Sequence, residues 1–163
     1  MPADTVKPAG RTRLAIGERE TRIVTVPAQG PATEWALPIG TQALGSGPFR
    51  HEPPSPLEIE HAIEQVEEAV MPLLRQLPRD TPWETRDAAT RQLRRLVHGG
   101  GEGHLSIDDV ERVFNQLAAV SQGRPVASSG LPPQAAFTAH VLILREAMHH
   151  LGFASLTVFT DPA

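Results

Sequence analysis

The sequence contains no cysteine and no tyrosine, and its aromatic residues are five phenylalanines and two tryptophans. The absence of cysteine excludes disulfides, thiolate catalysis and cysteine metal sites. With so few aromatic side chains, a core has to be built mainly from Leu, Ile, Val and Ala. Hydrophobic residues make up 40% of the 163 positions, which is enough for one domain with a real interior.

Long apolar runs and an excess of basic charge are also absent. No stretch reaches 18 consecutive apolar residues, so we expect no membrane span. A net charge of −4 gives no basic surface for DNA. Residues 1–10 are rich in Pro and Ala and lack an apolar signal segment. We therefore expect a flexible tail over 1–10, one domain over 11–163, and a bacterial, cytoplasmic protein.

Strand patterns dominate the first part of the chain. Residues 11–16 and 21–26 are predicted to be strands separated by a short turn, and the second is rich in β-branched side chains. A third strand is predicted over 33–39, where Pro38 weakens its far end. Three strands so close in sequence predict an antiparallel meander, and residues 153–159 predict a closing strand.

Helical patterns fill the middle of the chain. Ser55, Pro56 and Glu58 form a helix N-terminal signature, and apolar spacing continues to residue 77, with Pro72 able to kink or shorten the helix. Further helices are predicted at 84–97, from Ser106 onward, and from Pro132 to Leu151. The core face of the first helix is expected to comprise Ile59, Ile63, Val66, Val70 and Leu73. The order of the elements is α+β, and predicts an α/β fold with one β-sheet flanked by four helices.

Several of these segments occur in an order typical of one family. They are Trp35–Gly40, Pro53–Pro56, Val97–Gly99, His104–Asp109, Gly130–Ala135, His140–Leu144 and Leu156–Phe159. They resemble the segments "SLPLG", "DPPS", "VHG…LSxEDL", "GLPPxRA…ILxxLL" and "LTVS" of the exopolyphosphatase/guanosine pentaphosphate phosphatase (Ppx/GppA) family. The resemblance covers residues 13–160. It implies a single actin-like, ribonuclease-H-like lobe, equivalent to the second of the family's two lobes.

The segments that carry the family's chemistry are the ones that differ. Residues 15–22 match the phosphate loop "DIGGGSTE" but retain one glycine, Gly17, and place Ala15 at the Asp position and Glu20 at the Ser position. Residues 85–90 match the second glycine-rich loop, "GTGGT", and contain no glycine. The resemblance further implies that the general-base glutamate lies in the lobe that has no counterpart here, and that "DRGLREG" is reduced to residues 160–163.

What remains of a phosphate site is a set of positions that match the two loops. These positions are Gly17, Arg19, Thr21, Arg86 and Thr90. We expect weak contact with a phosphoanion there at most, because glycine-rich backbone is what lets N–H groups approach phosphate oxygens. No catalytic residue, metal ligand or cofactor is predicted, and Mg²⁺ is expected only if the chain is active.

The histidines admit simpler interpretations than a metal site. The glycine-rich stretch from His98 to His104 is predicted to be a surface loop, with an anion contact or a two-histidine metal site as alternatives. His140, His149 and His150 are expected at the surface or in helix capping.

Three functions remain open from the sequence. The first is a non-catalytic module that binds a protein partner, or weakly binds polyphosphate or a nucleotide. The second is an exopolyphosphatase or pppGpp phosphohydrolase completed by a second lobe or a second copy. The third is a structural dimer without a ligand. Self-association as a homodimer is expected through the strand at 11–16 and the closing strand at 153–159, if these are free edges.

Overall fold

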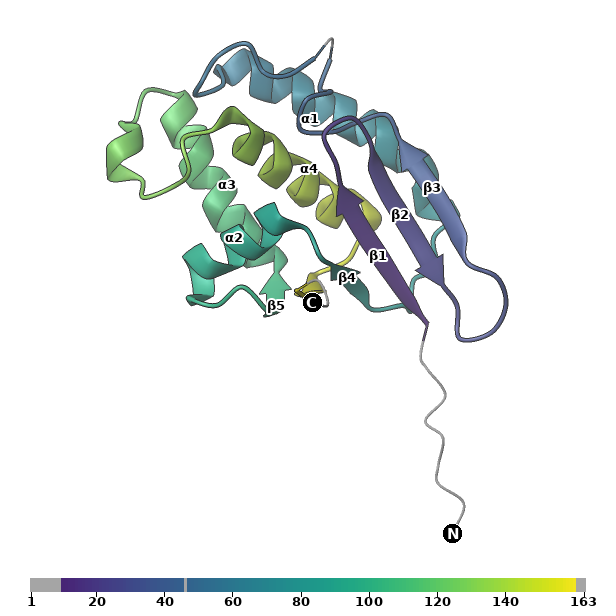
Figure 1. The fold of residues 1–163 in the computed structure, drawn as a ribbon. Coiled ribbons are helices and arrows are strands. Elements are labelled where there is room, and N and C mark those ends of the chain that lie inside the picture. Colours follow the sequence, from purple (N-terminus) through teal and green to yellow (C-terminus); the bar gives the residue numbers. More distant parts are fainter. Residues whose placement is uncertain (1–9, 46, 161–163) are drawn as a thin grey trace.

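A computed structural model of the chain describes residues 10–45 and 47–160. The expected tail at 1–10 falls almost wholly outside the described residues, as do residues 161–163. The described part forms one six-stranded sheet with four α-helices (Figure 1). The elements are β1 (Arg11–Ile16), β2 (Thr21–Val26), β3 (Thr33–Leu37), α1 (Pro56–Val70), η1 (Met71–Arg75), β4 (Trp83–Thr85), α2 (Ala88–His98), β5 (Gly103–Ser106), α3 (Ile107–Ser121), η2 (Val126–Ser128), α4 (Ala135–Leu151) and β6 (Ser155–Val158).

The first three strands form the predicted antiparallel meander. β1 pairs with β2 from Arg11 opposite Val26 to Ile16 opposite Thr21, and β2 pairs with β3. β3 ends at Leu37 and not at residue 39, because Pro38 has no N–H with which to continue the ladder. The strand order is β3-β2-β1-β4-β6-β5.

Two short strands were not predicted. Residues Trp83–Thr85 form β4, parallel to β1 and β6, where a helix from Glu84 was expected. Residues Gly103–Ser106 form β5, which is antiparallel to β6 and begins inside the stretch 98–104 predicted as a loop. Three or four residues are too few to show the alternation of a strand, and these segments become strands because neighbouring strands supply their hydrogen bonds.

The helices begin and end where local chemistry predicts, with three shifts, of which one is the start of α4 at Ala135 and not at Pro132. Ser55 and Glu58 form a capping box on α1, which ends at Val70 and passes into the 3₁₀-helix η1 that contains Pro72. α2 starts at Ala88, after the strand that replaces its predicted first turn. α4 ends with Gly152 in the left-handed conformation (φ 74°), which a residue without a Cβ adopts without strain.

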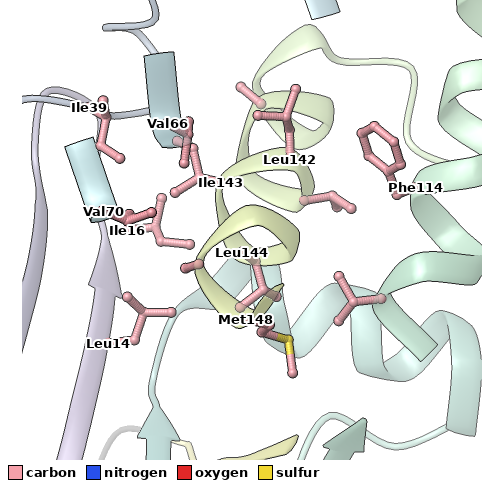
Figure 2. Packing of buried hydrophobic residues seen from close by; sticks show 14 of the residues in the cluster. Leu14, Ile16, Ile39, Val66, Val70, Phe114, Leu142, Ile143, Leu144 and Met148 are labelled. Carbon is pink, nitrogen blue, oxygen red and sulfur yellow. The ribbon is translucent and has the colours of Figure 1, made fainter. Parts of the chain in front are cut away.

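The interior lies on one side of the sheet. Alternate residues of β1 and β2 are buried, as Leu14 and Ile23 illustrate, whereas Arg13 and Arg22 on the opposite face reach solvent. α4 is central and packs against α1, α2, α3 and β1. Figure 2 shows Val66 of α1, Ile143 of α4 and Ile16 of β1 among the buried side chains.

Most of the predicted core face of α1 is confirmed. Ile59, Val66, Val70 and Leu73 are buried, and Ile63 is half-buried. In the described part of the chain, none of the helices combines the length and apolar content needed to cross a bilayer.

The strands expected to mediate self-association are not edges. β1 lies between β2 and β4, and β6 lies between β4 and β5, so both are paired on each side. The prediction of these two strands as contacts was wrong, because the sequence did not reveal β4 and β5. The edges of the sheet are β3 and β5.

Candidate functional site

An open cleft of about 590 Å³ lies where the two predicted phosphate loops meet. Its walls come from the end of β1 and the following turn, from Thr41, and from the first turns of α2 and α4. The lining residues are Ile16, Gly17, Glu18, Thr41, Asp87, Ala88, Ala89, Gln92, Gln134, Ala136, Phe137 and His140. The lining thus combines an apolar floor with amides and two carboxylates, and it includes no Lys or Arg.

The turn after β1 is closed on itself and covered by a second turn. The N–H of Gly17 donates to the carbonyl of Glu20 at 2.9 Å. From the covering turn, the N–H of Thr41 donates to the carbonyl of Gly17 at 3.0 Å, and that of Gln42 to the carbonyl of Glu18 at 2.8 Å. The amide that would cradle a phosphate at Gly17 is therefore already bonded within the chain.

Gly40 makes this close approach of the two turns possible. A Cβ atom at residue 40 would lie against the backbone carbonyl of Glu18, far inside van der Waals distance. Glycine is thus required here because a side chain would clash with the neighbouring turn. The backbone conformation does not require it, since Gly40 is not among the glycines with positive φ.

A carboxylate ties α2 to the end of β1. Asp87 is the N-cap residue of α2, but its side chain does not cap the helix. Its Oδ2 instead accepts a hydrogen bond from the N–H of Ile16 at 2.9 Å, and its own N–H donates to Oγ1 of Thr85 at 3.2 Å. The chain therefore places negative charge of its own beside the N-terminus of α2, where an anionic ligand would otherwise be favoured.

A carboxylate from a distant loop caps the N-terminus of α4. The N–H of Ala135 donates to Oε1 of Glu52 at 2.7 Å. A carboxylate at this position satisfies one of the free helix amides and interacts favourably with the helix dipole. Three backbone N–H groups beside the cleft, those of Ile16, Gly17 and Ala135, are thus bonded to the chain's own acceptors.

His140 lies buried beneath the cleft and is bonded to Thr90. Its Nε2 is 2.7 Å from Oγ1 of Thr90, and both residues are almost fully buried (2% and 0% exposed). Burial lowers the pKa of His140 to about 4, so the ring is neutral at pH 7 and supplies no positive charge. The expectation of a surface or capping role for His140 was wrong, because residues 137–144 of α4 are buried on every face of the helix.

The other predicted phosphate positions do not converge on the cleft. The hydroxyl of Thr21 is buried and donates to the carbonyl of Ile39 at 2.9 Å. Nη1 of Arg86 donates to the carbonyl of Thr160 at 2.7 Å, and its guanidinium lies 5.5 Å from the ring centroid of Phe159. Arg19 is exposed in the turn after β1. Of the five positions, Gly17 alone lines the cleft.

The two histidines of the glycine-rich stretch serve different elements. Nε2 of His98, at the end of α2, is 2.8 Å from Oδ2 of Asp109, which also forms the capping box of α3 with Ser106. Burial opposes ionisation of Asp109, but the hydrogen bonds from Ser106 and His98 outweigh it and lower its pKa. His104 lies on β5, and the described residues contain no group of three or more His, Asp or Glu placed to hold a metal ion.

Sequence reasoning missed three residues that shape the cleft, namely Glu52, Asp87 and Gly40. The signal for Asp87 was an acidic N-cap before a helix, which the misplaced start of α2 concealed. Glu52 acts across 83 residues, and the need for Gly40 depends on a contact between two turns. No local pattern encodes either of these.

The architecture is that of a single actin-like α/β lobe. A Ppx/GppA protein of Aquifex aeolicus superposes on it with a TM-score of 0.71 at 18% identity, over 96% of this chain and 54% of that chain. An exopolyphosphatase from Cytophaga hutchinsonii gives 0.69 at 16% identity over 93% and 53%. An exopolyphosphatase-like protein gives 0.69 at 16% over 96% and 57%.

These likenesses confirm the fold expected from the sequence resemblance. The chain has the fold of one part of the Ppx/GppA structures and spans about half of their length. No protein-family profile matches the chain. A comparison with curated proteins also gives no match.

Proposed function

We propose that the chain is a non-catalytic binding or interaction module built on a single Ppx/GppA-like lobe. One observation supports this above the others. At the cleft, the N–H groups of Ile16, Gly17 and Ala135 are hydrogen-bonded to acceptors of the chain itself. To reach these three amides, polyphosphate or pppGpp would have to displace their contacts and approach Glu18 and Asp87, and Coulomb repulsion opposes that approach.

The composition of the cleft supports a protein partner more than a phosphoanion. An apolar floor with amide and carboxylate groups suits neutral or cationic side chains, whereas the described lining offers phosphate no Lys or Arg. Weak binding of a phosphoanion is the alternative to a protein partner, and titration with tripolyphosphate tests it.

A phosphate-release assay tests the absence of catalysis. We expect the purified chain with Mg²⁺ to release no more phosphate from polyphosphate or pppGpp than a buffer control. Turnover by the wild-type chain that disappears in Arg19→Ala or Thr21→Val would contradict the proposal.

The second candidate is an enzyme completed by another polypeptide. It is motivated by the match to about half of each solved structure, since the remaining half of such a protein has no counterpart here. Adding a separately purified first lobe to the assay distinguishes the two. Phosphate release that requires both polypeptides would favour the enzyme, and none is expected under the proposal.

A further inference from the structure

The two edges of the sheet differ in how they are covered. At the β5 edge, Nε of Arg94 donates to the carbonyl of His104 at 3.0 Å, and its guanidinium lies so close to Gly103 that a Cβ there would clash. At the β3 edge, β3 pairs with β2 alone. Within residues 10–45 and 47–160, no side chain is hydrogen-bonded to the backbone of residues 33–36. Among the strands that the structure describes, only β3 therefore presents an open edge for strand addition.

Small and charged side chains alternate beside the β3 edge on the open face of the sheet. Glu34 and Ala36 are exposed on β3, and Ala36 is directly opposite Arg22 of β2. Nη1 of Arg22 lies 3.3 Å from Oε1 of Glu34, and its Nη2 lies 2.5 Å from Oε1 of Glu20. The β3 edge thus carries the carboxylate of Glu34 and, two residues later, the methyl group of Ala36, which lies next to the guanidinium of Arg22.

Pairing of two β3 strands is restricted to three antiparallel registers. In an antiparallel pair, residues directly opposite each other point to the same face of the sheet. A two-fold axis that relates two β3 strands must therefore pass through a residue and not between two residues, and the central residues of β3 are Glu34, Trp35 and Ala36. An axis at Glu34 sets two carboxylates directly opposite each other, which is unfavourable. An axis at Ala36 sets Glu34 opposite Pro38, which lies beyond the strand and cannot donate. Only an axis at Trp35 pairs all five residues of β3.

The register centred on Trp35 also matches the charges. It places Glu34 opposite the partner's Ala36, with the partner's Arg22 one strand further on. Strands in a sheet are about 4.8 Å apart, so the Cα atoms of Glu34 and the partner's Arg22 would be about 10 Å apart. The side chains of Glu34 and the partner's Arg22 are long enough to meet across that distance, above the methyl group of the partner's Ala36. The two-fold axis generates this contact twice.

We propose that the chain forms a homodimer by antiparallel pairing of two β3 strands around a two-fold axis at Trp35, with Glu34 of each copy beside the partner's Arg22. This inference rests on the proposed function in one respect, that the chain acts by associating with a protein. The interface lies on the sheet edge, and the hydrolysis assay reports on the cleft, so the two proposals can fail separately.

Sedimentation velocity of the full chain across a hundredfold dilution series tests the inference. We expect the mass of two chains at micromolar concentration and dissociation on dilution. Ala36→Glu puts a carboxylate opposite the partner's Glu34 and should weaken the dimer about tenfold or more. The matched control, Ala127→Glu, makes the same change at an exposed position of η2, outside the sheet, and should leave the dimer intact.

Glu34→Arg is a second variant, in case Ala36→Glu does not fold. It sets an arginine near the partner's Arg22 and should also favour the monomer. A wild-type mass of one chain throughout the series would overturn the inference. So would a dimer that neither Ala36→Glu nor Glu34→Arg weakens.

Discussion

The interior around α4 and the cleft at the end of β1 are neighbouring parts of one domain, but different interactions hold them together. The interior consists of apolar side chains such as Leu142 and Leu144. Other apolar residues of similar size at the same spacing can fill such an interior. The cleft is held by individual hydrogen bonds, such as those accepted by Asp87 and Glu52, whose geometry admits few substitutions. A fold can therefore persist at 16–18% identity, whereas the hydrogen bonds of the cleft depend on individual residues.

The largest effect is expected from a charge in the interior. Val66 is fully buried, so Val66→Asp places an unpaired carboxylate among apolar side chains. We expect destabilisation on the order of 4 kcal/mol or more, with unfolding or aggregation. Thermal melting followed by circular dichroism measures this. Leu57→Asp, at a position 59% exposed on the same helix, is the control and should melt close to the wild type. An unchanged melting temperature for Val66→Asp would show that this face of α1 is not part of the core.

A smaller effect is expected where the two turns meet beside the cleft. Gly40→Ala adds a methyl group against the carbonyl of Glu18, and backbone cannot move aside as a flexible side chain can. We expect a loss of about 1–3 kcal/mol in the free energy of unfolding, measured by urea denaturation. Gly100→Ala is the control, because its Cβ would meet only the end of the Arg94 side chain at 3.4 Å. Equal stability of the two variants would mean that the turns are not tightly packed.

The buried histidine predicts a pH dependence of stability. The pKa of His140 is about 4 in the folded chain and near 6.5 when unfolded, so the unfolded state binds the proton more readily. The stability associated with a neutral His140 is fully present above pH 6.5 and is lost as the pH falls from 6.5 towards 4. Between pH 7 and 5 this amounts to about 2 kcal/mol.

The variant His140→Gln should lack this dependence, because glutamine does not titrate. The exposed His104→Gln should retain it. Carboxylates with lowered pKa, such as Glu111 at about 2 through its hydrogen bond from Arg145, lose their contribution only below pH 4.5, outside this window. Parallel pH profiles for the wild type and His140→Gln would show that His140 is not buried in the neutral form.

Local patterns in the sequence predicted the elements that depend on local interactions. The β1–β2 turn, the capping boxes at Ser55 and Ser106 and the C-cap at Gly152 are each set by a few adjacent residues. β4 and β5 escaped prediction because strands of three or four residues exist only through pairing with distant strands. The bacterial, cytoplasmic setting remains a prediction.

The same distinction applies to the cleft. The family resemblance implied that residues 15–22 and 85–90 both belong to one phosphate site, and the structure brings Gly17 and Ala88 of these stretches into one lining. The sequence did not indicate that Thr90 would be buried against His140, or that Glu52 would cap α4, since both contacts join residues 50 or more positions apart. The chemistry of the cleft thus depends on long-range contacts that no motif records.

A backbone NMR titration with tripolyphosphate tests the central claim most directly. If the amides of Ile16, Gly17 and Ala135 are bonded within the chain, their resonances should not shift as the anion is added at fixed ionic strength. Saturable shifts confined to these amides and to the first turn of α2 would contradict the account, because they would show that a phosphoanion displaces Asp87 and Glu52 from the amides that they accept from.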